Sequence, residues 1–550
     1  GLNTAIGWAA LNTLDAGADG LNVAVGYSAG LAMTTATHNT LIGANAGDAL
    51  TTGAGNVAVG FNALTTEDGN GTATAIGYRA LATLNAGAES YNVAVGYDAG
   101  LNMTTGVRNT IIGGLAGDHL TTGGHNVAVG YEALSLEDAH GGNTAVGAQA
   151  LRVLNAGADG FNTAMGFVAG EAMTTGTNSV VIGALAGDAL TTGEGNVAVG
   201  KAALSTETTG GKNTAIGARS QEDVNNSGNG NNVSVGFESM LNATTAVANT
   251  AIGSSAIGDG ILTGDFNTVV GYLSGMDLTS GYDNVLVGAE AGTNLTTGFG
   301  NIAVGKEALE TSPDGIHNTA IGYQTLQDYN DGSTNGHNTA VGSRSQLQAT
   351  TGEFNTSLGS LSMGAGVTTG DQNIAIGYTA GISIAAGSFN VLMGNAAGTN
   401  ITTGTENVAI GHQALNTENA HGKNVAVGHT ALQTLDAGAD GFNVAVGNAA
   451  GKLMSTGTNN VIVGSLAGDA LTTGALNVAL GTNALGTEDT GNRNTAIGHG
   501  SLSSLNFAGN GYNTAVGYAS GTALSTGAQN TLIGGNAGDS LTTGVSNVAL

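Results

Sequence analysis

A five-residue phrase, Asn-(Thr/Val)-Ala-(Ile/Val)-Gly, recurs from one end of the chain to the other and constrains its fold more than any other feature. Examples are Asn3–Gly7, Asn56–Gly60, Asn126–Gly130 and Asn494–Gly498. In register, 32 copies can be read, mostly 17 residues apart and sometimes 18 to 20, and the last stops at Leu550 before its glycine. A fixed period of this length is typical of a solenoid, in which every repeat forms one coil.

The residues that follow each Asn predict a strand. With the Asn counted as position 0, position 1 is Thr, Val or Ile in all 32 copies, position 3 is aliphatic or Met, and position 4 is Gly in every complete copy. β-Branched side chains are stiff and fit a pleated surface, so they favour strands. We therefore predict an all-β fold, a parallel β-solenoid (β-roll) of 32 coils without substantial helix.

Alternation along the strand assigns these positions to two faces. Positions 1 and 3 share one face, and position 2, usually Ala, lies on the other. We expect the inner wall of the coil to be lined by position-3 residues such as Ile6, Val25, Ile42 and Val59. Because both faces are apolar or small, we expect the strand to be covered on both sides. The simplest second cover is an identical chain, which predicts a homo-oligomer.

The rest of each coil contains turn residues. Position 5 is variable and often aromatic, and position 7 never exceeds Thr in size, as at Ala29, Ala46 and Ala63. We expect these small residues to permit close packing of neighbouring chains. Many coils then carry a Thr-Thr-Gly turn, as at Thr51–Gly53, where the Gly would supply a positive φ. We also expect a second short strand in each coil.

Asn occupies position 0 in 30 of the 32 registers, the exceptions being Ala73 and Ser179. Stacked in successive coils, these side chains are expected to form an amide ladder in which each donates to the carbonyl of the next. The alternative is a row of ligand-binding amides. We favour the structural ladder, because corner Asn residues commonly satisfy turns.

A longer period lies on top of the coil. Gly7, Gly77 and Gly147 are every fourth position-4 glycine and lie 70 residues apart, so four coils make one super-repeat. The spacing is irregular between about 236 and 411. We interpret residues 1–550 as one continuous repeat array. Since the array starts just before a repeat and stops inside one, we expect it to be a window on a longer chain.

Composition excludes several classes of protein. The formal net charge is −28, from 39 acidic and 11 basic residues, so the basic surface that nucleic acid requires is not expected. The chain has no cysteine and therefore no disulfide framework. It has no apolar run of about 18 residues, so we predict no membrane-spanning segment. Its 96 glycines are compatible with a regular coil because 41% of its residues are apolar.

Acidic loops supply the best candidate metal ligands. Asp15 and Asp19 flank a glycine-containing turn, and Asp436 and Asp440 repeat the pattern. Several oxygen ligands around such a turn suit a hard cation, so calcium is the one cofactor that the sequence suggests. The alternative is a plain acidic loop, because an equivalent coil has Asn155 in place of the first Asp.

Other chemistry is weakly indicated. Adjacent carboxylates recur at Glu67–Asp68, Glu137–Asp138 and Glu488–Asp489 and would be candidates for glycan hydrolysis, but we expect a solvated loop. The ten histidines are scattered, and we expect loop residues rather than metal ligands. The Thr-Thr pairs suggest ice binding, but adjacent side chains of a strand face opposite ways, so corner residues are the better interpretation. We predict no catalytic residues and no enzyme activity.

The repeated phrase resembles the head repeats of trimeric autotransporter adhesins, and related repeats of phage tail fibres and bacterial surface fibres. The match is closest in Asn126–Gly130 with Tyr131, Ala133 and Leu134, where Val127 replaces the usual Thr. The resemblance covers essentially the whole chain. It implies a left-handed parallel β-roll with three parallel chains packed along a common axis.

These features lead to an expectation about function. We expect a non-enzymatic structural or adhesive fibre segment, a rigid extracellular rod of a cell surface or virion that presents loops. It should self-associate as a homotrimer or filament and contact surface glycans or a host receptor. The alternatives are a phage tail-fibre shaft that binds a host receptor or glycan, and an ice-binding solenoid.

Overall fold

The five-residue phrase forms one short strand in each coil, as its β-branched residues predict. The computed structural model describes residues 1–15, 19–69, 71–225, 228–330, 332 and 336–550. It contains 32 parallel strands stacked as a β-solenoid, and no described residue lies in a helix. The predicted fold class is therefore confirmed.

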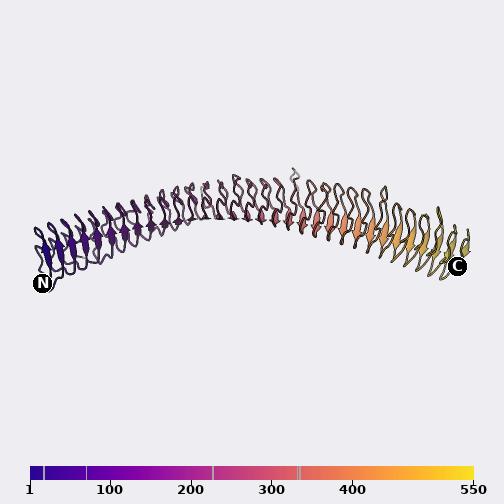
Figure 1. Ribbon diagram of the computed structural model, residues 1–550, viewed down its shortest axis with the longest axis horizontal. Helices are drawn as coiled ribbons and strands as arrows, with labels where there is room; N and C mark the ends of the chain where they lie inside the picture. The colour runs from indigo at the N-terminus through magenta and orange to yellow at the C-terminus, as the bar shows by residue number, and fades with distance from the viewer. Residues whose placement is uncertain (16–18, 70, 226–227, 331, 333–335) are drawn as a thin grey trace. The chain divides into compact units, whose positions relative to one another are not determined.

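The chain consists of two units, Gly1–Leu273 and Ser274–Leu550. Within each unit, Figure 1 shows successive coils stacked with their strands in one row. The strands of the first unit are β1 (Thr4–Ile6), β2 (Val23–Val25), β3 (Thr40–Ile42), β4 (Val57–Val59), β5 (Thr74–Ile76), β6 (Val93–Val95), β7 (Thr110–Ile112), β8 (Val127–Val129), β9 (Thr144–Val146), β10 (Thr163–Met165), β11 (Val180–Ile182), β12 (Val197–Val199), β13 (Thr214–Ile216), β14 (Val233–Val235), β15 (Thr250–Ile252) and β16 (Thr268–Val270).

The second unit has the same organisation. Its strands are β17 (Val285–Val287), β18 (Ile302–Val304), β19 (Thr319–Ile321), β20 (Thr339–Val341), β21 (Thr356–Leu358), β22 (Ile374–Ile376), β23 (Val391–Met393), β24 (Val408–Ile410), β25 (Val425–Val427), β26 (Val444–Val446), β27 (Val461–Val463), β28 (Val478–Leu480), β29 (Thr495–Ile497), β30 (Thr514–Val516), β31 (Thr531–Ile533) and β32 (Val548–Ala549). The described parts of both units contain no helix long and apolar enough to cross a membrane.

Strands pair in register, so equivalent residues of successive coils lie side by side. Ala58 of β4, for example, pairs with Ala75 of β5. The glycine that ends each phrase is required for this stacking. Gly60 has φ +140°, and a Cβ there would lie 2.1 Å from the carbonyl oxygen of Gly77. Any larger residue would be strained and would also push two coils apart.

The strand faces the interior with position 2, which is the reverse of what we expected. Ala24, Leu41 and Ala58 are fully buried, whereas Ile6 and Ile42 at position 3 are 60% and 40% exposed. Val25 and Val59, at the same position, are only partly buried. The prediction that these position-3 residues line the inner wall is therefore wrong. Position 2 is Ala in most coils and an aliphatic residue such as Leu41 in others, and both kinds are buried, whereas the position-3 side chains lie outside.

The small residues of position 7 also lie in the interior. Ala29, Ala46 and Ala63 are fully buried within a single chain, so the expectation that they permit close packing of neighbouring chains is wrong. They face position 2 across the coil. Two serines show this contact directly, because the hydroxyl of Ser345 at position 7 lies 2.5 Å from that of Ser357 in β21. Both hydroxyls are buried and satisfy each other, as burial requires.

Turns replace the second strand that the sequence predicted. In the coil of β4, Asn62 and Leu64 have φ of +54° and +55°, which a β-strand does not allow. Their N–H groups point in opposite directions along the stack, to Ala44 O of the preceding coil at 3.1 Å and to Ala80 O of the following coil at 3.0 Å. Coil-to-coil hydrogen bonding therefore continues through this segment without strand geometry.

The Thr-Thr-Gly turn requires glycine because the next coil leaves no room for a side chain. Gly123 does not lie in the left-handed region, contrary to our expectation, but a Cβ there would lie 2.2 Å from His140 O of the next coil. Thr121 Oγ1 donates to Asp138 O at 2.6 Å, and Thr122 Oγ1 faces Ala139 O at 3.4 Å. These threonines are corner residues bonded to the next coil, as we predicted.

The predicted asparagine ladder is confirmed in both units. In the first, Asn39 donates from its backbone N and from Nδ2 to Asn22 Oδ1, at 2.9 and 3.2 Å. Its Nδ2 also donates to Gly53 O at 2.8 Å. In the second, Asn460 makes the equivalent bonds to Asn443 Oδ1 at 3.0 and 3.1 Å. The side chains are buried and used within the chain, so they do not form a ligand-binding row.

Candidate functional site

Buried glutamates are the most unusual polar feature of the interior. Position 11 carries a fully buried Met or Leu in many coils, such as Met33 and Leu50. In five coils it carries a glutamate instead, and each of these side chains is buried; they are Glu67, Glu137, Glu207, Glu418 and Glu488. A carboxylate in an apolar register position must find donors, because burying it unpaired is costly.

Backbone N–H groups supply most of those donors. Glu488 Oε1 accepts from Gly491 N at 2.7 Å within its own turn, and Oε2 accepts from Phe507 N of the next coil at 3.4 Å. Glu137 does the same with His140 N at 3.2 Å and Ala156 N at 3.5 Å. The glutamate thus connects its own turn to the following coil.

Burial changes the proton affinity of these groups. Desolvation raises the pKa of Glu137, Glu418 and Glu488 above the ordinary value, and the backbone donors offset only part of this effect. Our expectation that the adjacent Glu and Asp residues lie together in a solvated loop is wrong for the glutamates. The glutamate of each pair is buried, whereas its Asp neighbour is at least partly exposed, so the two carboxylates are not equally accessible to a bound sugar.

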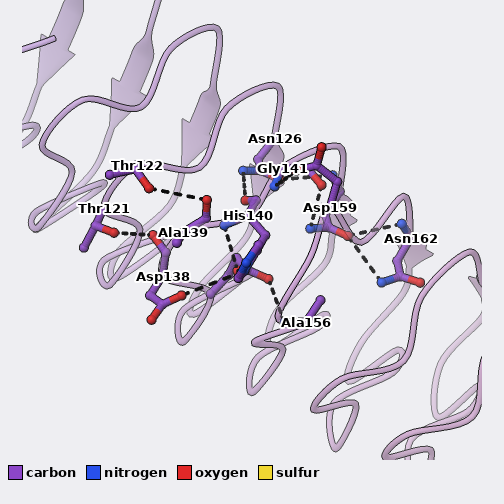
Figure 2. Close-up of polar contacts among 12 residues, drawn as sticks. Thr121, Thr122, Asn126, Asp138, Ala139, His140, Gly141, Ala156, Asp159 and Asn162 are labelled. Atoms are coloured by element: carbon purple, nitrogen blue, oxygen red, sulfur yellow. Dashed lines mark hydrogen bonds and ion pairs between the residues drawn. The ribbon is translucent and has the colours of Figure 1, made fainter.

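A histidine joins the glutamate in two of the five turns. In the first unit, His140 Nδ1 lies 3.2 Å from Glu137 Oε1 and 4.0 Å from Asp138 Oδ1. Figure 2 shows this turn, with Thr121 of the preceding coil on one side of His140 and Ala156 of the following coil on the other. One ligand atom each from Glu137, Asp138 and His140 lies within 4.8 Å of the others, so these three could hold a metal ion.

The second unit has a related cluster, built differently. Glu418 and His421 keep the spacing of Glu137 and His140, but the second carboxylate is Asp436 from the next coil. His421 Nδ1 lies 3.8 Å from Glu418 Oε1. These two are the described groups in which three His, Asp or Glu side chains are close enough to share an ion.

The aspartates predicted to bind calcium fall into different environments. Asp15 and Asp19 are exposed, and residues 16–18 between them lie outside the described residues. Asp440 pairs with Lys423 Nζ at 2.6 Å and accepts a hydrogen bond from Gly422 N at 3.3 Å. The lysine holds the pKa of Asp440 below its usual value. Asp436 instead joins the cluster just described, and calcium binding at all four positions stays a prediction.

Sequence reasoning missed both histidine-containing clusters. The signal was present in the register, because a Glu at position 11 replaces a residue that is Leu or Met in other coils. The His follows three residues later. The sequence did not reveal that Asp436 is the third member of the Glu418–His421 cluster. Asp436 lies 18 residues after Glu418 and is brought close only by the stacking of two coils.

The outer face of the strands presents exposed apolar side chains in each unit. In the first unit, position-3 side chains exposed on this face include Ile42, Ile76, Ile112, Met165, Ile216 and Ile252. Position 5 borders it with exposed aromatic residues, and some of these stack from coil to coil. Phe61 and Tyr78 have ring centroids 5.3 Å apart, and Tyr78 and Tyr97 have theirs 5.1 Å apart.

The second unit presents the same outer face. Its exposed position-3 residues include Ile321, Leu358, Met393, Ile410, Leu480 and Ile533. Position 5 is less aromatic here, and His412 and His429 stack at 5.1 Å. Neither position 1 nor position 3 is charged in any strand of the chain. Each unit therefore carries an uncharged apolar stripe along its strands.

Known proteins give no further guidance. No family model matches the chain, and no curated protein matches it in sequence. Function must therefore be inferred from the residues and their geometry.

Proposed function

We propose that this chain is a structural or adhesive fibre segment, without enzyme activity, that assembles with identical copies through the outer face of its strands. The observation that carries the proposal is the uncharged apolar stripe on every strand. A monomer that buries only the inner face leaves this stripe in water, although its position-3 residue is aliphatic or Met in each coil.

The size of the stripe supports association. With 16 strands in one unit, a strand spacing of about 4.8 Å and three residues of about 3.3 Å each, the outer face of the strands covers about 760 Å². The largest apolar patch of an ordinary monomer is about 300–600 Å², whereas a stable interface buries about 800 Å² per partner. The stripe of one unit is therefore close to the size of an interface.

A parallel homotrimer is the simplest assembly that covers the stripe. Three copies, each turning its strands to a common axis, bury three equivalent faces and leave no stripe exposed. The resemblance to autotransporter adhesin heads and tail-fibre repeats supports the same arrangement and a left-handed roll. The turns and acidic loops then face outward, where a cell-surface or virion fibre would meet glycans or a receptor. The alternative to the trimer is a filament in which neighbouring chains share contacts other than this stripe.

The oligomeric state in solution tests this proposal. We expect multi-angle light scattering to give a mass three times that of the chain. Replacing Val59, Val95 and Val129 together by Glu should weaken assembly by at least about 100-fold, because desolvated charges at an interface core cost about 2–5 kcal/mol each. The matched control is Leu136→Glu, an exposed apolar residue on a turn. A folded wild-type monomer at micromolar concentration would refute the proposal.

Ice binding and glycan hydrolysis are tested on the same material. The corner threonines that suggested ice binding are bonded to the next coil, as Thr121 is to Asp138 O, which leaves them poorly placed to order water. Thermal hysteresis by the purified chain, or cleavage of a glycan, would overturn the assignment to a passive fibre.

A further inference from the structure

The turn at Glu418 contains two buried polar atoms that have no hydrogen-bond partner among the described residues. Glu418 is fully buried, and its Oε1 accepts a hydrogen bond from His421 N at 3.2 Å, whereas its Oε2 has no donor within hydrogen-bond distance and the carboxylate has only a weaker interaction with the Ala437 N–H of the next coil. The Nδ1 atom of His421 is buried and unpartnered as well. Leaving such atoms unsatisfied costs about 1–3 kcal/mol each, and more for a charged group. A native turn with two of them requires an explanation.

A third side chain completes a cluster around these atoms. One potential ligand atom each from Glu418, His421 and Asp436 lies within 4.8 Å of the other two. In a tetrahedral zinc site with bonds of about 2.0–2.1 Å, ligand atoms are about 3.3–3.4 Å apart, so the three atoms would need to approach by at most about 1.5 Å. Asp436 is exposed and His421 is partly exposed, which gives an ion a path from solvent.

The ligand types select the class of ion. Calcium takes six to eight oxygen ligands, whereas this cluster offers one imidazole nitrogen and two carboxylates. That mixture suits zinc and similar divalent transition metals. Two carboxylates would also balance the charge of the ion. Lys423, the nearby cation, is paired with Asp440 instead.

We propose that Glu418, His421 and Asp436 bind a divalent transition-metal ion of the zinc type. The ion would connect the coil of β24 with the coil of β25, because Glu418 and His421 belong to the first and Asp436 to the second. The site uses residues of one chain only, so it is independent of the assembly proposed above.

The other glutamate turns of the chain show what the site requires. At Glu488 the histidine is replaced by Gly491 and the third ligand by Asn506, and both carboxylate oxygens have backbone donors. At Glu137 the histidine is kept, but His140 Nδ1 already lies 3.2 Å from the carboxylate. The unpartnered atoms and the carboxylate from the next coil therefore occur together at Glu418.

Zinc titration of the whole chain tests the site. After dialysis against a chelator, isothermal titration with ZnCl₂ should give one tight site in the wild type. His421→Gly and Asp436→Asn should each weaken it at least about 10-fold, the loss typical of even indirect changes to a metal site. Both variants should fold, because Gly491 and Asn506 occupy the equivalent positions. His140→Gly is the matched control and should keep the site.

A spectroscopic measurement separates this site from surface binding. Co²⁺ should give visible absorption typical of a low-coordinate N/O site in the wild type and in His140→Gly, but not in His421→Gly. Ca²⁺ should not compete. The proposal is overturned if the wild type binds no zinc at millimolar concentration, if His421→Gly binds as the wild type does, or if His140→Gly alone removes the site.

Discussion

The inner and outer sides of one strand differ although both are apolar. In β8, Ala128 is fully buried inside the coil, whereas Val127 and Val129 are only partly buried on the outside. The inner position is limited in size, because the opposite turn of the coil lies close to it. The outer positions carry no charge, because position 1 is Thr, Val or Ile and position 3 is aliphatic or Met. The inner side therefore stabilises one chain, and the outer side is suited to association with another.

The largest effect is expected from a charge on the inner side. Ala128→Asp would bury a carboxylate with no donor nearby and should destabilise its coil by about 4 kcal/mol or more. Because each coil contacts mainly its neighbours, the loss should stay local. Hydrogen exchange should show faster exchange in the coils of β7 to β9 and native protection in distant coils. Uniform protection across the chain would contradict the placement of Ala128.

The same charge on the outer side should act on assembly. Val129→Asp should change the stability of the isolated coil by about 1 kcal/mol or less, since surface substitutions have small effects. If the stripe is an interface, the aspartate is desolvated there, and association should weaken by about 2–5 kcal/mol. Light scattering over a dilution series measures this change. Unaltered association, or unfolding as severe as that of Ala128→Asp, would remove the distinction between the two sides.

A carboxylate that is native to the interior allows a milder test. Burial raises the pKa of Glu488 above 4.5, so the folded chain binds a proton that the unfolded chain has released. The contribution of this group to stability therefore increases as pH falls from the raised native pKa towards 4.5, and decreases as pH rises through the same window.

Substitution isolates that contribution. Glu488→Gln should remove this pH dependence and change stability at pH 7 by about 1 kcal/mol or less. Melting curves between pH 4.5 and 7 measure it, with Glu406→Gln, an exposed acidic residue, as the control. Identical pH profiles of wild type and Glu488→Gln would show that the buried carboxylate does not titrate differently on folding.

The smallest effect is expected at the exposed acidic loops. If calcium binds at Asp15 and Asp19, a calcium chelator should lower the stability of that coil by about 1 kcal/mol or less at modest ion concentration. Replacing both residues by Asn should abolish the response without changing the fold. The coil with Asn155 is the internal control. If chelation leaves the melting curve of the native protein unchanged, these residues form a plain acidic loop.

The sequence was sufficient to predict the fold but not its inner and outer sides. Periodicity defined the coils, the strands and the asparagine ladder, because each depends on residues at fixed spacing. Alternation defines two faces without saying which is inside, and we chose the larger side chains of Ile42 and Val59 for the interior. The restriction of position 7 to residues no larger than Thr was the better guide, since these small residues lie inside the coil.

The candidate sites were harder to predict. Glu418 and Asp436 lie in different coils, and only the stacking of these coils brings them close together. The buried state of the glutamates also contradicts their usual preference for solvent. It becomes predictable only when Glu418 is aligned with Met33 and Leu50 at position 11.

The repeated register has a consequence for how such a gene can change in length. Most junctions between coils within a unit use the same strand pairing, the same glycine contact and the same asparagine bonds, with strand pairing as in Ala58 with Ala75 and glycine contact as in Gly60 with Gly77. Unequal recombination between 70-residue units would join two coils whose facing surfaces already fit. We expect alleles that differ by whole units to fold equally well, so that natural selection can adjust the reach of the protein in steps.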